Sequence, residues 1–110
     1  MEREQLEYSK QILAICKSLP ENFYHEHLES LYEIAIIFKY TKGDKLVAHM
    51  EQFGQLISNL QICFDVFSKS PENIFCQKDL DIAITNLHYA LLEMRETLGI
   101  TENRSISSSR

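Results

Sequence analysis

Apolar residues recur every three or four positions along two long stretches of the chain. Residues spaced in this way share one face of an α-helix, so each stretch predicts a long helix with a single apolar stripe. Narrow and regular stripes of this kind are typical of helices that pack side by side at shallow crossing angles. The first stripe comprises Leu46, Met50, Phe53, Ile57, Leu60, Phe64 and Phe67, and the second comprises Leu80, Ile84, Leu87, Leu91, Met94 and Leu98.

Two shorter helices are predicted before these stripes. The first is expected over residues 3–17, and Pro20 ends the helical pattern because proline lacks an N–H and disfavours helical geometry in the residue before it. The second is expected over residues 22–40, with Gly43 as a left-handed C-cap after its end. The chain therefore begins with a helix–turn–helix unit.

Local capping signals set the expected limits of the two striped helices. Asp44 is expected to cap the third helix, which continues to about Phe67. Ser70-Pro71 then matches an N-cap followed by proline at the first helical position, and a short turn is expected there. The last helix is predicted over residues 78–98, with Gly99 ending it.

Four helices in 110 residues indicate a single all-α domain over residues 1–100. The sequences of segments 17–23 and 69–75 are similar, and each lies at an expected helix–helix junction. We therefore predict an antiparallel four-helix bundle built from two helical hairpins. The segment 101–110 is rich in serine and lacks apolar periodicity, so it is predicted to be a disordered tail.

Composition argues against several classes of function, including nucleic-acid binding and membrane association. The net charge of −5 argues against nucleic-acid binding, which requires clustered Lys and Arg. No apolar run approaches the ~20 residues that cross a bilayer, and the first residues do not resemble a signal peptide, so no membrane association is expected. Cys16, Cys63 and Cys76 lack metal-ligand spacing and indicate reduced thiols in a cytoplasmic protein.

The second helix carries more apolar residues than one buried face requires, because its segment 34–38 is apolar around the whole circumference. The residues expected to face the core are Leu28, Leu31, Ala35 and Phe38. Tyr32, Ile36 and Tyr40 would then lie on another side, and such residues are typical of a partner surface. A homodimer, a different partner protein and simple burial by neighbouring helices all explain this pattern.

Polar residues adjoin the same helix. His25 and Glu29 are expected to form a polar rim beside the apolar anchors, and with Glu33 they would also make one stripe of three potential metal ligands. None of the acidic residues has a histidine three positions later, which argues against a di-iron bundle. A metal site that uses His25 and Glu29 and a solvated polar stripe are the two alternatives, and we predict no bound metal or cofactor.

His49 offers the other chemical alternative. The segment Ala48-His49-Met50-Glu51-Gln52-Phe53-Gly54 loosely resembles the active helix of histidine phosphotransfer domains, which are four-helix bundles. The resemblance implies that His49, at the edge of the core and partly exposed, would accept a phosphoryl group. The family has Lys three residues and Gly four residues after this histidine, where this chain has Gln52 and Phe53. The cation that would steady the phosphoryl group is therefore missing.

No nucleophile elbow, Walker loop or dinucleotide fingerprint is present, so the sequence does not predict an enzyme. The segment Leu31-Tyr32-Glu33, followed by Gly43-Asp44, is faintly similar to flagellin-export chaperones but does not assign the chain to that family. The sequence predicts a non-catalytic protein-binding module, such as a small acidic adaptor, inhibitor or secretion-chaperone-like regulator. Binding is expected on the faces of the second and third helices.

Overall fold

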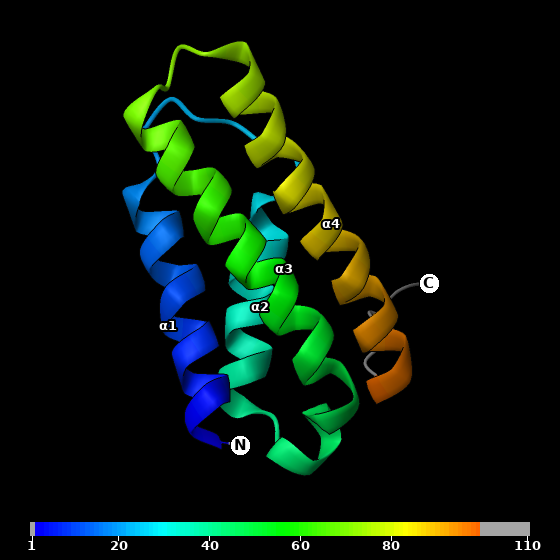
Figure 1. Cartoon of the computed structure of the whole chain (residues 1–110). Helices are drawn as coiled ribbons and strands as arrows, with labels where there is room; N and C mark the ends of the chain where they lie inside the picture. The colour runs from blue at the N-terminus through cyan, green and yellow to red at the C-terminus, as the bar shows by residue number, and fades with distance from the viewer. Residues whose placement is uncertain (1, 100–110) are drawn as a thin grey trace.

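The computed structural model describes residues 2–99, which form four α-helices joined by short connections (Figure 1). The helices are α1 (Glu2–Ser18), α2 (Leu28–Tyr40), α3 (Gly43–Lys69) and α4 (Ile74–Leu98). Helices α1 and α2 form one antiparallel hairpin, and α3 and α4 form the other, which confirms the predicted all-α antiparallel bundle of two hairpins. The expected domain limit at residue 100 and the expected disordered tail at 101–110 lie outside the described residues.

The two hairpins pack side by side, with α1 against α3 and α2 against α4. The helices within each of these two pairs run in the same direction, as Figure 1 shows. Polar side chains set the register of the first hairpin, because the Gln5 amide donates to the carbonyl oxygens of Phe38 and Thr41. The Ser9 hydroxyl donates to the carbonyl oxygen of Ala35 at 2.9 Å. These bonds join the start of α1 to the end of α2.

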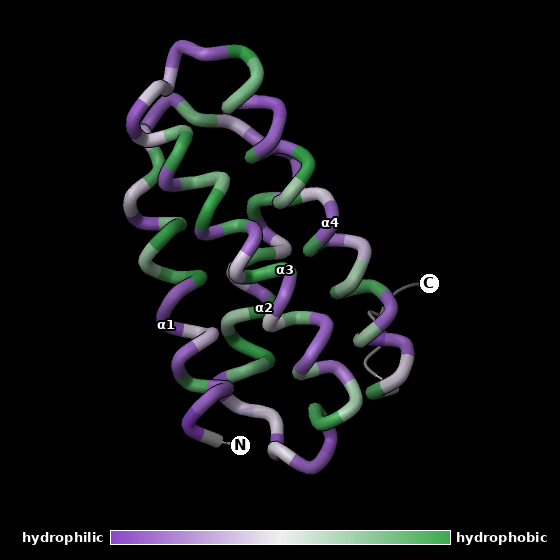
Figure 2. The backbone as a smooth tube through the Cα atoms, in the orientation of Figure 1, coloured by the Kyte–Doolittle hydropathy of each residue, from purple (hydrophilic) through white to green (hydrophobic). Residues whose placement is uncertain are grey.

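The two apolar stripes form most of the core, as predicted. All of their residues are buried except Phe64 and Leu98, which are half-buried. The aromatic rings of Phe38 on α2 and Phe53 on α3 are fully buried and meet edge to face, with 5.3 Å between their centroids. Figure 2 shows hydrophobic and hydrophilic residues alternating along every helix. One apolar core therefore holds both hairpins together.

A close contact between α1 and α3 explains a glycine inside a long helix. A Cβ atom at Gly54 would lie only 2.5 Å from the hydroxyl oxygen of Tyr8. The Tyr8 ring in turn packs on Phe38, with 5.9 Å between the ring centroids. Glycine in a helix interior costs about 0.5–1 kcal/mol relative to alanine. Here it makes room for an aromatic side chain from the neighbouring helix.

The predicted start of the second helix near Asn22 is wrong, because α2 begins only at Leu28. A turn in which the Phe23 N–H donates to the Pro20 carbonyl oxygen follows α1, and residues 19–27 form the connection. The Phe23 ring packs edge to face on Phe67 of α3, with 5.8 Å between centroids. This tertiary contact competes with helix formation in a segment whose sequence is compatible with a helix.

Gly43 and Asp44 also differ from the prediction. Gly43 is the first residue of α3 rather than a left-handed cap, and Asp44 lies in the first turn without acting as the N-cap. The chain changes direction between α2 and α3 through extended backbone at Thr41 and Lys42, so this turn needs no residue of positive φ. Gly99, by contrast, ends α4 with a φ of 73°, as predicted.

The fourth helix begins earlier than predicted and with a different cap. Asn73 is its N-cap, and the Asn73 side-chain oxygen accepts hydrogen bonds from the backbone N–H groups of Phe75 at 2.8 Å and Cys76 at 3.4 Å. Ser70, the expected N-cap, is instead the C-cap of α3. The N-cap interaction satisfies N–H groups that have no partner within the helix.

Replacing Asn73 with alanine is expected to lower the free energy of unfolding by about 1 kcal/mol, because two N–H groups lose their acceptor. The measurement is chemical denaturation monitored by circular dichroism. Asn73→Asp keeps an acceptor at the same place and should restore most of the loss. Ser70→Ala is the matched control and should change the stability by less than about 0.5 kcal/mol. Equal losses at the two positions would contradict the assignment of the cap.

Candidate functional site

The side of α2 that faces away from the bundle carries a stripe of exposed apolar and aromatic side chains. Tyr32 is 44% exposed, Ile36 is 57% exposed and Tyr40 is 74% exposed. Their spacing of four residues places them in one row on the helix surface. The opposite side of α2 is buried, as predicted, through Leu31, Ala35 and Phe38, whereas Leu28, also expected to face the core, is half-buried. We define the outer face of α2 as this row and the charged residues beside it, namely Glu29, Tyr32, Glu33, Ile36, Lys39 and Tyr40.

The outer face is tied to both neighbouring helices. Tyr32 is hydrogen-bonded to Cys16 of α1. Glu33 forms an ion pair with Arg95 of α4, in which Oε2 of Glu33 lies 3.2 Å from Nε of Arg95. Burial raises the pKa of the Cys16 thiol to about 11, and the hydrogen bond to Tyr32 only partly offsets this effect. The thiol is therefore protonated at neutral pH and is a poor nucleophile.

Charges along the outer face are separated by sign. Glu29 and Glu33 belong to the N-terminal half of α2, whereas Lys39 lies in its last turn and the exposed Lys42 follows the helix. The Lys39 ammonium lies 5.5 Å from the centre of the Tyr40 ring, a cation–π contact. Acids near the N-terminus and bases near the C-terminus also suit the helix dipole. The apolar row thus has an acidic end and a basic end.

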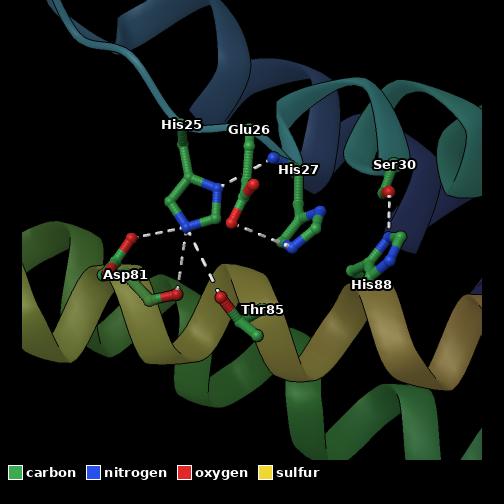
Figure 3. A network of polar contacts seen from close by, with 7 residues as sticks. All are labelled: His25, Glu26, His27, Ser30, Asp81, Thr85 and His88. Carbon is green, nitrogen blue, oxygen red and sulfur yellow. Dashed lines mark hydrogen bonds and ion pairs between the residues drawn. The ribbon is translucent and has the colours of Figure 1, made fainter.

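His25 does not share this face, although the sequence suggested a helical stripe with Glu29. It lies in the connection before α2 and is only 8% exposed. Figure 3 shows its ring directed at α4, where Nε2 pairs with the Asp81 carboxylate and lies 3.3 Å from the Asp81 carbonyl oxygen and 3.5 Å from the Thr85 hydroxyl. Nδ1 accepts the backbone N–H of His27, so the proton of a neutral ring sits on Nε2. His25 thereby anchors the connection to α4.

Two further histidines stack beside this anchor. The rings of His27 and His88 lie 3.9 Å apart and are nearly parallel, at 10°. The Ser30 hydroxyl and Nδ1 of His88 form a hydrogen bond of 2.6 Å (Figure 3). Burial, and then the proximity of His27, lower the pKa of His88, whereas Glu26 acts in the opposite direction. The stacked arrangement therefore favours the neutral form of His88.

The histidine cluster does not form a metal site. Across residues 2–99, no three His, Cys, Asp or Glu side chains are placed to share one metal ion. Glu29 and His25 lie on different segments of the structure, one on α2 and one in the connection. The hypothesis of a metal held by these two residues therefore gains no support from the geometry.

His49 is more deeply buried than the sequence suggested. It is only 9% exposed, and its Nε2 is out of contact with solvent and without a hydrogen-bond partner in the described part of the chain. A phosphoryl acceptor must present a nitrogen to its donor, and Nε2 does not do so here. A cleft between α3 and α4 adjoins this residue, lined by Ala48, His49, Gln52, Glu93, Glu96 and Thr97. The phosphotransfer hypothesis receives no support from this geometry.

A second apolar surface lies where the two hairpin connections meet. The segments of similar sequence, 17–23 and 69–75, both reach this end of the bundle (Figure 1). Between them is an open cleft of about 640 Å³, whose lining includes Pro20, Phe23, Tyr24, Phe67, Pro71 and Ile74. The side chains of Tyr24, Ile74 and Phe75 are between 72% and 83% exposed. The predicted antiparallel bundle places these two connections at the same end, whereas the cleft between them is visible only in the structure.

Comparison of the chain with protein-family models, with curated proteins and with solved structures found no match. None of the helices described between residues 2 and 99 combines the length and the apolar character needed to cross a membrane. The site must therefore be interpreted from its own geometry. The outer face of α2 brings together Tyr32, Ile36, Tyr40 and Glu29. His25 and His49 lie outside this face and are buried, His25 in the connection before α2 and His49 on α3.

Proposed function

We propose that this chain is a non-catalytic, cytoplasmic protein-interaction module that binds another protein through the outer face of α2. The observation that supports the proposal is the exposed row Tyr32, Ile36 and Tyr40 on a helix whose other side is already buried. Aromatic and aliphatic anchors supply most of the binding energy in protein interfaces, and charged residues around them set orientation. The outer face of α2 has both the apolar anchors and the charged residues around them.

The position of α2 in the bundle suits this role. It packs against α1 on one side and α4 on the other, so its backbone is held in place before a partner arrives. Binding to a rigid helix avoids the free-energy cost of ordering a flexible segment. A partner helix that lies across the row would use ordinary helix-face recognition. Roles that fit include an adaptor, an inhibitor or a secretion-chaperone-like regulator.

The third helix was also expected to contribute, and it exposes Val47, Ile62 and Val66. Val47 lies fifteen residues before Ile62, so these side chains do not form a continuous row like that on α2. We therefore centre the proposal on α2 and use Ile62, which is 62% exposed, as the comparison position.

Introducing a charge at the centre of the row is expected to abolish the complex. Ile36→Asp places a carboxylate where an apolar anchor would be desolvated, and we expect at least a thirty-fold loss of affinity, about 2 kcal/mol. The helix content and melting temperature should stay close to those of the unmodified chain, because Ile36 is 57% exposed. Affinity is measured by titration calorimetry once the partner is in hand.

The partner is captured by a photo-crosslinking residue at position 36 in the tagged chain, expressed in its source cells. A discrete covalent product at position 36, absent when the same residue replaces Ile62, would support the proposal. Ile62→Asp is the matched charge control and should leave the complex intact. No product at position 36, or equal products at both positions, would contradict binding through the outer face of α2.

A further inference from the structure

We infer that the occupant of the outer face of α2 is a second copy of the same chain, which packs α2 against α2 in an antiparallel pair about a two-fold axis at Ile36. This inference rests on the proposed function, because it names the partner of the same face. It follows from the order of apolar and charged residues along the helix. A two-fold axis requires a surface that is complementary to itself.

The apolar row is symmetric about Ile36. Tyr32 lies one turn before it and Tyr40 one turn after it, both on the same ridge of side chains spaced by four residues. In an antiparallel pair centred on Ile36, each Tyr32 meets the Tyr40 of the other copy, and the two Ile36 side chains meet each other.

The charges select the antiparallel orientation. Glu29 and Glu33 precede Ile36, whereas Lys39 and Lys42 follow it. The same two-fold axis places Glu33 opposite Lys39 of the other copy, and Glu29 beside the segment that carries Lys42. A parallel pair would instead place acids against acids and bases against bases. Opposite charges at the edge of an interface fix orientation and register.

The existing contacts of these charges are compatible with this pairing. Glu33 accepts from Arg95 at 3.2 Å, yet its side chain is 39% exposed and retains lone pairs for a second cation. Lys39 lies over its own Tyr40 ring, 5.5 Å from the centroid, which keeps its ammonium at the border of the row. Antiparallel helix dipoles add to the attraction. No group on the face has to be left buried without a partner.

Disulfide crosslinking tests both the occupant and the register. Position 36 lies on the axis, so Ile36→Cys should form a covalent dimer of the purified chain under mild oxidation. Position 29 lies seven residues away, about 10 Å along the helix, so the two copies of Glu29→Cys would be ~20 Å apart. A disulfide requires Cα atoms within about 7 Å. Glu29→Cys is therefore expected to stay monomeric on a non-reducing gel.

A mixture of two cysteine variants shows whether the two α2 helices run antiparallel. Tyr32→Cys and Tyr40→Cys should each fail to crosslink alone, because each residue lies four positions from the axis, and should crosslink when the two variants are mixed. The native cysteines are kept out of the reaction: Cys63 is replaced by serine and Cys16, which contacts Tyr32, by alanine in every variant, and Cys76 is buried. Circular dichroism confirms that each variant retains its helices.

Sedimentation velocity of the unmodified chain provides the independent measurement. A concentration-dependent dimer that Ile36→Asp converts to monomer, together with the expected crosslinks, would support the inference. A monomer at every concentration, or a dimer that crosslinks at position 29 and not at 36, would overturn it. In either of those cases the proposed function still stands if position 36 captures a different protein in source cells, so the two ideas fail separately.

Discussion

Replacing Phe53 with alanine is expected to lower the free energy of unfolding by about 3–5 kcal/mol. Phe53 is fully buried, and its ring meets the ring of Phe38 at an interplanar angle of 89°. The substitution removes the apolar area of a large side chain and leaves a cavity between α2 and α3. Because small domains are stable by about 5–15 kcal/mol, this change removes a large share of the total.

The measurement is urea denaturation followed by circular dichroism, with Phe75→Ala as the matched control. Phe75 is 78% exposed, so the same deletion there should change the stability by less than about 0.5 kcal/mol. The double variant Phe38→Ala/Phe53→Ala should show coupling between the two rings of about 0.5–1.5 kcal/mol. Similar losses at Phe53 and Phe75 would show that the two positions do not differ in burial as described.

Lowering the pH below 6.5 is expected to destabilise the fold through His88. Burial and the neighbouring His27 lower the pKa of His88 from its ordinary value of 6.5, so the unfolded chain binds this proton more readily than the folded chain. The contribution of His88 to stability is therefore complete above pH 6.5 and is lost as the pH falls from 6.5 to the pKa of the folded state. A charged ring would also face His27 in the stack at 3.9 Å.

Other charges around the ring set the size of this effect. Glu26 favours the protonated form of His88, whereas Arg95 and His25 oppose it. The test is the free energy of unfolding measured on both sides of pH 6.5 for the unmodified chain and for His88→Gln. The pH dependence should be weaker in His88→Gln, which retains a polar group near Ser30 but does not titrate.

Tyr89→Phe is the control for this test. Tyr89 lies beside the stack, with its ring centroid 5.4 Å from that of His88. Its replacement alters the surroundings of the stack and leaves His88 in place, so the pH dependence should be retained. If His88→Gln showed the same pH dependence as the unmodified chain, the role assigned to His88 would be wrong.

The candidate surface on α2 could be predicted in part from sequence. The helical period separated Leu31, Ala35 and Phe38 from the row Tyr32, Ile36 and Tyr40, and the structure buries the first set and exposes the second. Periodicity succeeds here because a helix in contact with a core must hide one side. Whether the exposed row binds a partner stays a prediction that the crosslinking experiments address.

Helix ends were harder to predict because several residues offer similar capping chemistry. Ser70 and Asn73 are both good N-cap residues, and the chain uses Asn73. Gly43 suits a left-handed cap, but extended backbone at Thr41 and Lys42 made that conformation unnecessary. The choice depends on how far each helix must extend to reach its neighbour, which local sequence does not specify.

Residue periodicity and backbone preference were enough to specify the helical class, the two buried stripes and the end of α4 at Gly99, because both act within a few residues. The pairing of α1 with α3 and of α2 with α4, and the contacts of His25 and His27 with α4, could be found only in the packed fold. His27 and His88 are 61 positions apart, and no local pattern connects them. Such contacts arise from the packing of whole hairpins, which depends on side-chain shape across the interface.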